Sequence, residues 1–134
     1  MNIADIISDA WQQEKLPVIN GLIKACGSFY ELDMTAGCKL VEKDFKVAVF
    51  DMYSSVYYRS EVTYRNTIFY CGGGSMGGDG WLLAINDNDP QWLFFSENVN
   101  PFEKVRVENN EIHVMNNMGN DWIFPVDKPE KMRY

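Results

Sequence analysis

A hydrolytic nucleophile and its base could be supplied by Cys71 or Ser75 together with His113. A thiol or hydroxyl becomes a nucleophile when a base lies within hydrogen-bond reach and accepts its proton. His113 is the single histidine of the chain, and nothing in the spacing places it beside either nucleophile. It also alternates with apolar neighbours, which predicts an exposed position. The sequence therefore favours a binding protein over an enzyme.

A glycine-rich tract from Gly72 to Gly80 contains the spacing G-x-G-x-x-G after a predicted strand. A dinucleotide site also needs a helix after this turn, and a P-loop needs a lysine. Here the tract contains no lysine, and a predicted strand that begins at Trp81 follows it. We therefore expect no bound nucleotide. The tract is either a flexible connection or a close crossing of two backbone segments, which glycine permits.

Metal ligands are not grouped in the sequence. The segment from Asp87 to Asp89 resembles the start of an EF-hand loop, but Trp92 and Asn98 stand where that loop needs Gly and Glu. The cysteines contain no CxxC pair and are expected to be reduced thiols: Cys26, Cys38 and Cys71. We expect no metal and no cofactor.

The net charge of −7 is unevenly distributed. The segment from Asn66 to Glu103 contains no lysine or arginine but five carboxylates: Asp79, Asp87, Asp89, Glu97 and Glu103. Such a segment repels a phosphate backbone, so nucleic-acid binding is disfavoured, and it attracts a basic protein. The charge is equally compatible with a role in solubility alone.

The segment from Val105 to Val114 predicts a β-hairpin, because apolar and polar residues alternate on both sides of Asn109 and Asn110, which suit a two-residue turn. In this register Glu108 faces Glu111, and Arg106 faces His113 one step behind. The carboxylate pair is either a solvated tip or a contact for Lys or Arg of a partner. The predicted partner-binding residues are Asp79, Asp87, Asp89, Glu97, Glu108, Glu111 and His113.

Helices are predicted at the start of the chain. The apolar spacing of residues 3–11 predicts a helix capped by Asn2. Pro17 is suited to begin a second helix, with Gly27 as its end; its apolar face would consist of Ile19, Leu22, Ile23 and Cys26. Residues 45–58 fit a helical stripe, yet their Val, Phe and Tyr content slightly favours strands.

Strands are predicted for the rest of the chain. Residues 61–71 predict an extended segment with one apolar side, formed by Val62, Tyr64, Ile68 and Tyr70. Residues 81–85 and 92–95 are expected to pair around the turn residues between them. The predicted fold class is α+β, with an N-terminal helical pair packed on a largely antiparallel, twisted sheet in one domain, 1–134.

The composition, 46% apolar and 14% aromatic, is typical of a folded protein. No apolar run reaches the roughly 20 residues that span a bilayer, and the first residues lack the pattern of a secretory signal. We expect a cytoplasmic protein, monomeric or weakly dimeric, without a membrane contact.

The order Phe69-Tyr70-Cys71-Gly72-Gly73-Gly74 and then Gly80-Trp81-Leu82-Leu83-Ala84-Ile85 resembles the glycine-rich turn before a core strand in the SUKH superfamily. The resemblance covers residues 67–95 and extends to the bacterial immunity proteins of polymorphic and contact-dependent toxin systems. It implies an inhibitor that covers the active site of a basic toxin domain, such as a nuclease, in a one-to-one complex. The chain departs from SUKH because it is strongly β after Pro101.

A second interpretation remains open. The aromatic residues could instead line the pocket of an NTF2-like α+β domain that binds or transforms a small molecule, with helices covering a curved sheet. The single histidine and the absence of a metal-ligand cluster make catalysis the less favoured alternative.

Overall fold

The structure is a computed structural model that describes residues 2–35 and 37–134. The described chain contains one α-helix, α1 (Ile3–Gln12), and two short 3-10 helices, η1 (Val47–Phe50) and η2 (Pro129–Lys131). The strands are β1 (Lys15–Pro17), β2 (Gly21–Lys24), β3 (Phe29–Asp33), β4 (Lys39–Lys43), β5 (Tyr53–Tyr64), β6 (Thr67–Gly74), β7 (Gly80–Asn86), β8 (Asp89–Ser96), β9 (Phe102–Glu108), β10 (Glu111–Asn116) and β11 (Asp121–Pro125).

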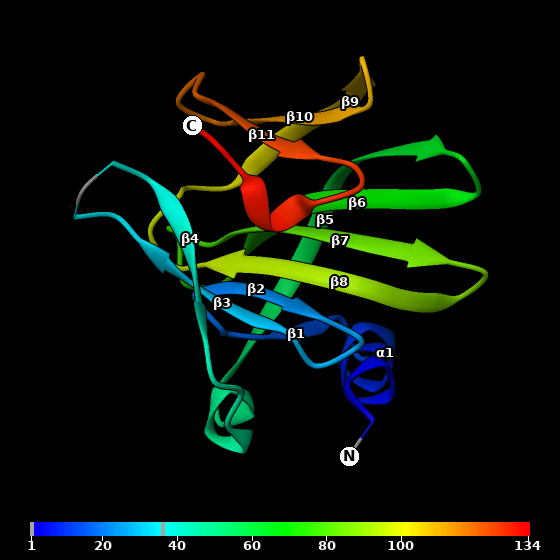
Figure 1. Cartoon of the computed structure of the whole chain (residues 1–134), viewed down its shortest axis with the longest axis vertical. Helices are drawn as coiled ribbons and strands as arrows, with labels where there is room; N and C mark the ends of the chain where they lie inside the picture. The colour runs from blue at the N-terminus through cyan, green and yellow to red at the C-terminus, as the bar shows by residue number, and fades with distance from the viewer. Residues whose placement is uncertain (1, 36) are drawn as a thin grey trace.

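Two antiparallel sheets build the molecule (Figure 1). The larger sheet has eight strands in the order β1-β5-β6-β7-β8-β2-β3-β4, and the smaller has the order β11-β10-β9. The smaller sheet and η2 lie on one face of the larger sheet, and α1 lies beyond β8 at the opposite side (Figure 1). The predicted α+β class with a helical pair is therefore wrong, because the described chain is mostly antiparallel sheet with a single α-helix.

Apolar side chains fill both faces of the larger sheet. Along β7, Leu82 belongs to the cluster under the smaller sheet, whereas Trp81 and Leu83 belong to the cluster under α1. Successive residues of a strand point to opposite faces, so a strand covered on both faces is apolar throughout. This explains why residues 81–84 are all fully buried.

Helix α1 confirms the first prediction. Ile3, Ile7 and Ala10 are buried on one side of the helix. The side chain of Asn2 accepts a hydrogen bond of 3.2 Å from the backbone N–H of Asp5, as expected of an N-cap.

The predicted second helix is wrong, because residues 15–17 and 21–24 are two short strands. Leu22 faces the cluster under the smaller sheet and Ile23 faces the cluster under α1. Asn20, with a φ of 49°, separates the two strands. Two strands that are buried on both faces and joined by a bend imitate the apolar spacing of a helix.

The segment from residue 45 to residue 58 contains both kinds of structure. Val47–Phe50 forms the short helix η1, and β5 begins at Tyr53, so the slight preference for strands is correct for the second half.

The predicted single apolar side of residues 61–71 is wrong. Arg65 and Asn66 form a turn with positive φ that divides the segment into two strands. Val62 and Tyr64 pack against the cluster under the smaller sheet, whereas Tyr70 packs against the cluster under α1.

The two hairpin predictions are confirmed. Strands β7 and β8 pair around Asp87 and Asn88, whose φ angles are 50° and 64°. Strands β9 and β10 pair around Asn109 and Asn110, whose φ angles are 52° and 59°. Such turns favour Asn because its side chain tolerates positive φ.

The glycine-rich tract is a close crossing of backbone segments. A Cβ atom on Gly72 would lie 2.0 Å from the carbonyl oxygen of Tyr57, and one on Gly80 would lie 2.3 Å from that of Asn100. Strands β6 and β7 pair directly on either side of the loop. The tract thus brings β5, β6 and the β8–β9 connection together, and no helix follows it.

Candidate functional site

The five carboxylates of the segment without basic residues do not share one surface. Asp79 is fully buried, where its carboxylate accepts a hydrogen bond of 2.8 Å from Ser54. Glu97 accepts a hydrogen bond of 2.8 Å from Asn20, and Glu103 pairs with Arg59 at 3.1 Å. Only the two aspartates of the β7–β8 turn, Asp87 and Asp89, are exposed and outside the ion pairs that the structure describes. A partner can therefore reach this turn but not Asp79.

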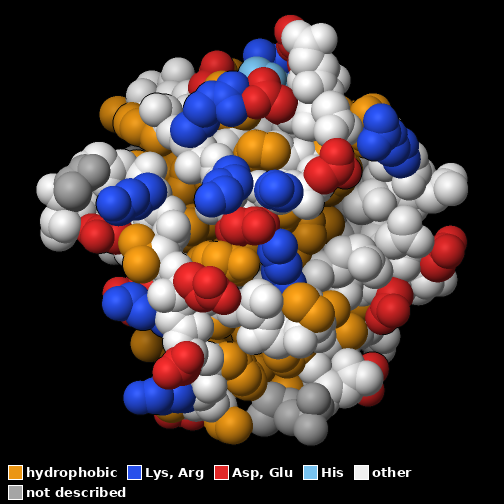
Figure 2. All heavy atoms as spheres, viewed as in Figure 1, with side chains coloured by type: hydrophobic (Ala, Val, Ile, Leu, Met, Phe, Trp, Pro, Cys, Tyr) orange, Lys and Arg blue, Asp and Glu red, His pale blue; other side chains and the backbone are white. Residues whose placement is uncertain are grey.

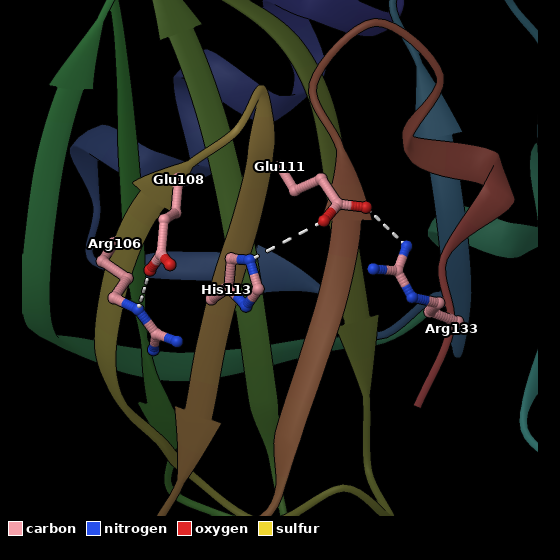
Figure 3. Close-up of polar contacts among 5 residues, drawn as sticks. All are labelled: Arg106, Glu108, Glu111, His113 and Arg133. Carbon is pink, nitrogen blue, oxygen red and sulfur yellow. Dashed lines mark hydrogen bonds and ion pairs between the residues drawn. The ribbon is translucent and has the colours of Figure 1, made fainter.

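The tip of the β9–β10 hairpin has the predicted register, with Glu108 opposite Glu111 and Arg106 opposite His113. However, each of these two carboxylates forms an ion pair with an arginine of the same chain (Figure 3). Glu108 pairs with Arg106 at 3.0 Å, and Glu111 pairs with Arg133 at 2.6 Å. Because these groups are already paired within the chain, the tip is a poorer candidate for a cationic partner than the sequence indicates.

The ion pair between Glu111 and Arg133 should make the stability of the fold depend on pH in the acid range. The hydrogen bond from Arg133 holds the pKa of this carboxyl below its usual range. A carboxyl with a lowered folded-state pKa stabilises the fold above its unfolded pKa, and this contribution is lost as pH falls through the folded pKa. We expect Glu111→Gln to lower the melting temperature slightly at neutral pH and not at all in strong acid, as measured by circular dichroism. Glu108→Gln controls for the loss of one charge, and a difference that persists in acid would contradict the assignment.

The nucleophile candidates are not assembled with His113. Burial, followed by the charge of Glu103, raises the pKa of the Cys71 thiol to about 12, so the thiol is protonated at neutral pH. Cys71 lies in the core cluster between the sheets. Ile112 and Val114 are buried on the inner face of β10, so His113 lies on its outer face. Cys71 and His113 therefore form no dyad, and the Ser75 hydroxyl contacts the Ser54 hydroxyl at 3.4 Å instead.

A groove between α1 and the ends of the β5–β6 and β7–β8 hairpins is the strongest candidate site. We call it the aromatic groove. Its cavity measures about 570 Å³. The residues that shape it include Trp11, Ile68, Tyr70, Ile85, Asp87 and Pro90. Helix α1 supplies one wall, and strands β6 and β7 supply the apolar floor.

Two aromatic rings that line this groove, those of Trp11 and Tyr70, begin a row that continues to Tyr58 outside it. The Trp11 ring lies 5.2 Å from the Tyr70 ring and 5.4 Å from the buried Trp81 ring. The Tyr58 ring stands edge-on to Tyr70 at 5.7 Å and continues the row into solvent, with 56% of its surface exposed. Rings at these separations and angles attract one another, so the row is held rigidly before any partner arrives.

Asp87 is the one acidic side chain among the described lining residues of the groove. A second carboxylate, Glu61, lies outside the lining, directly opposite Tyr70 in the β5–β6 ladder. Of the lining residues that the structure describes, none is Lys or Arg. Burial, followed by the charges of Glu61 and Tyr58, raises the pKa of the Tyr70 hydroxyl, which therefore stays a neutral hydrogen-bond donor. Acidic side chains also occupy the edge of the molecule where the β7–β8 hairpin ends (Figure 2).

Of the predicted site residues, only Asp87 lines the aromatic groove. Sequence reasoning assigned Trp11 to the apolar stripe of α1 and did not connect it with Tyr58 or Tyr70. The sequence did contain one indication of a surface role. Trp11 is the largest side chain of the apolar stripe of α1, and it lies near the end of the helix, where its ring is only half-buried. The other residues that line the groove come from segments far apart in the sequence, which only the folded topology brings together.

Searches against family models, curated proteins and solved structures found no match to the chain. Within residues 2–35 and 37–134, no group of three or more His, Cys, Asp or Glu side chains is arranged to hold a metal ion. The described helices include none with the length and hydropathy needed to cross a bilayer.

Proposed function

We propose that the chain is a protein-binding module that inhibits a basic protein, and that the aromatic groove receives a Lys or Arg side chain of that partner. The observation that carries the proposal is the composition of the groove. Its lining combines the rings of Trp11 and Tyr70 with the carboxylate of Asp87 and contains no described basic side chain. Tyr58 and Glu61 lie next to Tyr70, outside the lining.

The physical basis is the attraction of a cation to both kinds of group. A guanidinium or ammonium over an aromatic ring gains about 0.5–2 kcal/mol, and more as the contact loses water. A carboxylate at the rim adds a charge-assisted hydrogen bond. The net charge of −7 adds long-range attraction, which raises the association rate at low ionic strength.

The biological role that fits this chemistry is that of an immunity protein, which neutralises a toxin domain such as a nuclease by covering its active site. Support for it comes from the acidic charge and from the resemblance of residues 67–95 to the SUKH turn. A nuclease active site binds phosphates through basic residues, so an acidic inhibitor with exposed aromatic rings complements it.

The test uses the protein encoded directly upstream of this chain as the partner. The two proteins are purified separately, and their association is measured by surface plasmon resonance and by light scattering. We expect a one-to-one complex whose association rate falls steeply between low and high salt. The toxic activity of the upstream protein should be lost in the complex.

Matched variants locate the contact. Asp87→Asn and Tyr58→Ala should each weaken the complex by about tenfold or more. Asp89→Asn removes the same charge from the same turn outside the groove, and Tyr57→Ala removes a neighbouring tyrosine that contacts Arg59 and Gly73 rather than Tyr70. Both controls should bind nearly as the parent does. Equal effects of Asp87→Asn and Asp89→Asn, or a rate that ignores salt, would contradict the proposal.

A further inference from the structure

An asparagine followed by a glycine joins the first two strands of the larger sheet. Asn20 lies between β1 and β2 with a φ of 49°, and Gly21 begins β2. It is the single Asn-Gly pair of the sequence. Such a pair is prone to deamidation, because glycine has no side chain to hinder the attack of its backbone nitrogen on the preceding side-chain amide. The bend between β1 and β2 therefore contains a chemically labile peptide.

The fold requires glycine at the second position of this pair. A Cβ atom on Gly21 would lie 2.0 Å from the carbonyl oxygen of Tyr30 in the neighbouring strand β3. Because this oxygen belongs to the backbone, a larger residue would have to push β2 and β3 apart. Asn20 suits the left-handed φ of the bend, since Asn tolerates this conformation better than most residues. The labile pair is thus a consequence of the backbone geometry.

Glu97 holds the side-chain amide of Asn20 through both of its polar atoms. The Nδ2 of Asn20 donates to Glu97 Oε1 at 2.8 Å, and its Oδ1 accepts from the backbone N–H of Glu97 at 2.9 Å. We call these two hydrogen bonds the amide clamp. The clamp ties the bend between β1 and β2 to the connection between β8 and β9, and it uses the N–H group that deamidation removes.

The backbone nitrogen of Gly21 is also engaged in the closed fold. Gly21 lies opposite Phe95 in the β2–β8 ladder. Just beyond the end of β2, the N–H of Ala25 donates to the carbonyl of Gln91 at 2.9 Å. Bonded pairs recur at every second residue of an antiparallel ladder, so the register makes Gly21 and Phe95 a bonded pair as well. The nucleophile and the amide that it would attack are therefore held by different partners.

We propose that Asn20 is a latent deamidation site, which the closed fold protects and which reacts when the end of β2 opens. In the open state the backbone nitrogen of Gly21 attacks the amide carbon of Asn20. A carbon–nitrogen bond forms, and the amide nitrogen leaves as ammonia with the proton that the backbone nitrogen gives up. Water then opens the resulting succinimide ring and leaves aspartate or isoaspartate at this position, with a new negative charge.

The product cannot rebuild the amide clamp. A carboxylate has no N–H to donate, so two carboxylates would face each other where Asn20 Nδ2 now lies 2.8 Å from Glu97 Oε1. Like charges at this separation repel each other, and isoaspartate also lengthens the backbone at the bend. The reaction therefore converts a transient opening of β2 into a lasting one. The described lining of the aromatic groove contains neither Asn20 nor Glu97, so the inference does not rest on the proposed function.

The first experiment follows deamidation of the whole chain by peptide mapping and mass spectrometry. The protein is kept in mildly alkaline buffer with and without denaturing urea, and isoaspartate is detected with isoaspartyl methyltransferase. In urea, Asn20 should react before every other asparagine. In the folded protein its reaction should be at least about tenfold slower, because only the open fraction reacts. Glu97→Ala should accelerate the reaction of the folded chain, whereas Glu103→Ala, which removes a carboxylate paired with Arg59, should not.

A second set of variants measures the effect of the product on the fold. Asn20→Asp should lower the urea concentration at the unfolding midpoint more than Asn66→Asp does. The control adds the same charge at an exposed turn residue whose φ is 64°. Glu97→Gln, combined with Asn20→Asp, should recover most of the loss, because the new amide can donate to the new carboxylate.

Two results would overturn the proposal. One is a reaction of Asn20 that is as fast in the folded protein as in urea, or slower in urea than that of another asparagine. The other is an Asn20→Asp variant that is as stable as Asn66→Asp, or one that Glu97→Gln does not rescue. An Asn20→Asp chain that fails to fold shows the expected destabilisation, and its rescue by Glu97→Gln then decides whether charge repulsion is the cause.

Discussion

We expect Gly72→Ala to lower the free energy of unfolding by about 3 kcal/mol, although alanine is otherwise more stable than glycine within a strand. The new Cβ would stand 2.0 Å from the carbonyl oxygen of Tyr57 and 2.8 Å from the Cα of Tyr58. Both are backbone atoms of β5, so the clash is relieved only if β5 and β6 separate. The ladder is irregular between Tyr58 and Ser60, and Gly72 lies at this bulge. In thermal unfolding the loss corresponds to roughly 10 °C.

Gly77→Ala is the matched control from the same tract. No atom lies within 4 Å of a Cβ placed there, but the residue has a φ of 84°. Alanine in this conformation costs about 1 kcal/mol through strain alone. If the two variants unfold at the same denaturant concentration, the tract tolerates side chains and is a flexible connection after all.

The glycine tract shows what local sequence could and could not decide. The sequence excluded a nucleotide loop, because Trp81 begins a strand where a helix would be needed, and it left two alternatives open. The choice between them depends on Tyr57 of β5 and on Asn100 of the β8–β9 connection, whose backbone oxygens approach the tract. No pattern within residues 72–80 records those approaches.

Sequence patterns predicted correctly those structures that depend on contacts between residues close together in the chain. The turns at Asp87 and Asn109 and the cap at Asn2 depend on residues within a few positions, and their chemistry is specific to Asn and Asp. The helical pair failed for the opposite reason. Leu22 and Ile23 are both buried because sheets and helices cover both faces of β2, and this cover is supplied by distant segments.

For the candidate sites too, features set by nearby residues were predictable and features set by distant residues were not. Charge indicated a basic partner, and Asp87 was among the residues predicted to contact it. The register of Glu108 with Glu111 was also predictable, because it depends on one turn. Their neutralisation was not, since Arg133 reaches Glu111 from the end of the chain. The meeting of Trp11 with Tyr70 depends entirely on topology.

Trp11→Ala should affect stability and partner binding together, because Trp11 joins the helix to the sheet and also forms a wall of the aromatic groove. Its ring contacts Tyr70 and Trp81, and few other large side chains of α1 reach the sheet at this end. Replacing a large aromatic residue by alanine costs about 3–5 kcal/mol when it is fully buried. Trp11 is half-buried, so we expect a loss of about 3 kcal/mol, measured by urea unfolding.

Trp11→Phe separates the two roles. Phenylalanine keeps a ring against Trp81 and should retain most of the stability, with a loss of about 1 kcal/mol. A smaller ring binds a cation more weakly than indole does, so the complex with the upstream protein should still be weakened severalfold. Hydrogen exchange of α1 provides the independent readout: it should accelerate in Trp11→Ala and stay near the parent rate in Trp11→Phe. Parent affinity in both variants would remove Trp11 from the groove's function, and Tyr70, Tyr58 and the carboxylates would have to hold the cation without it.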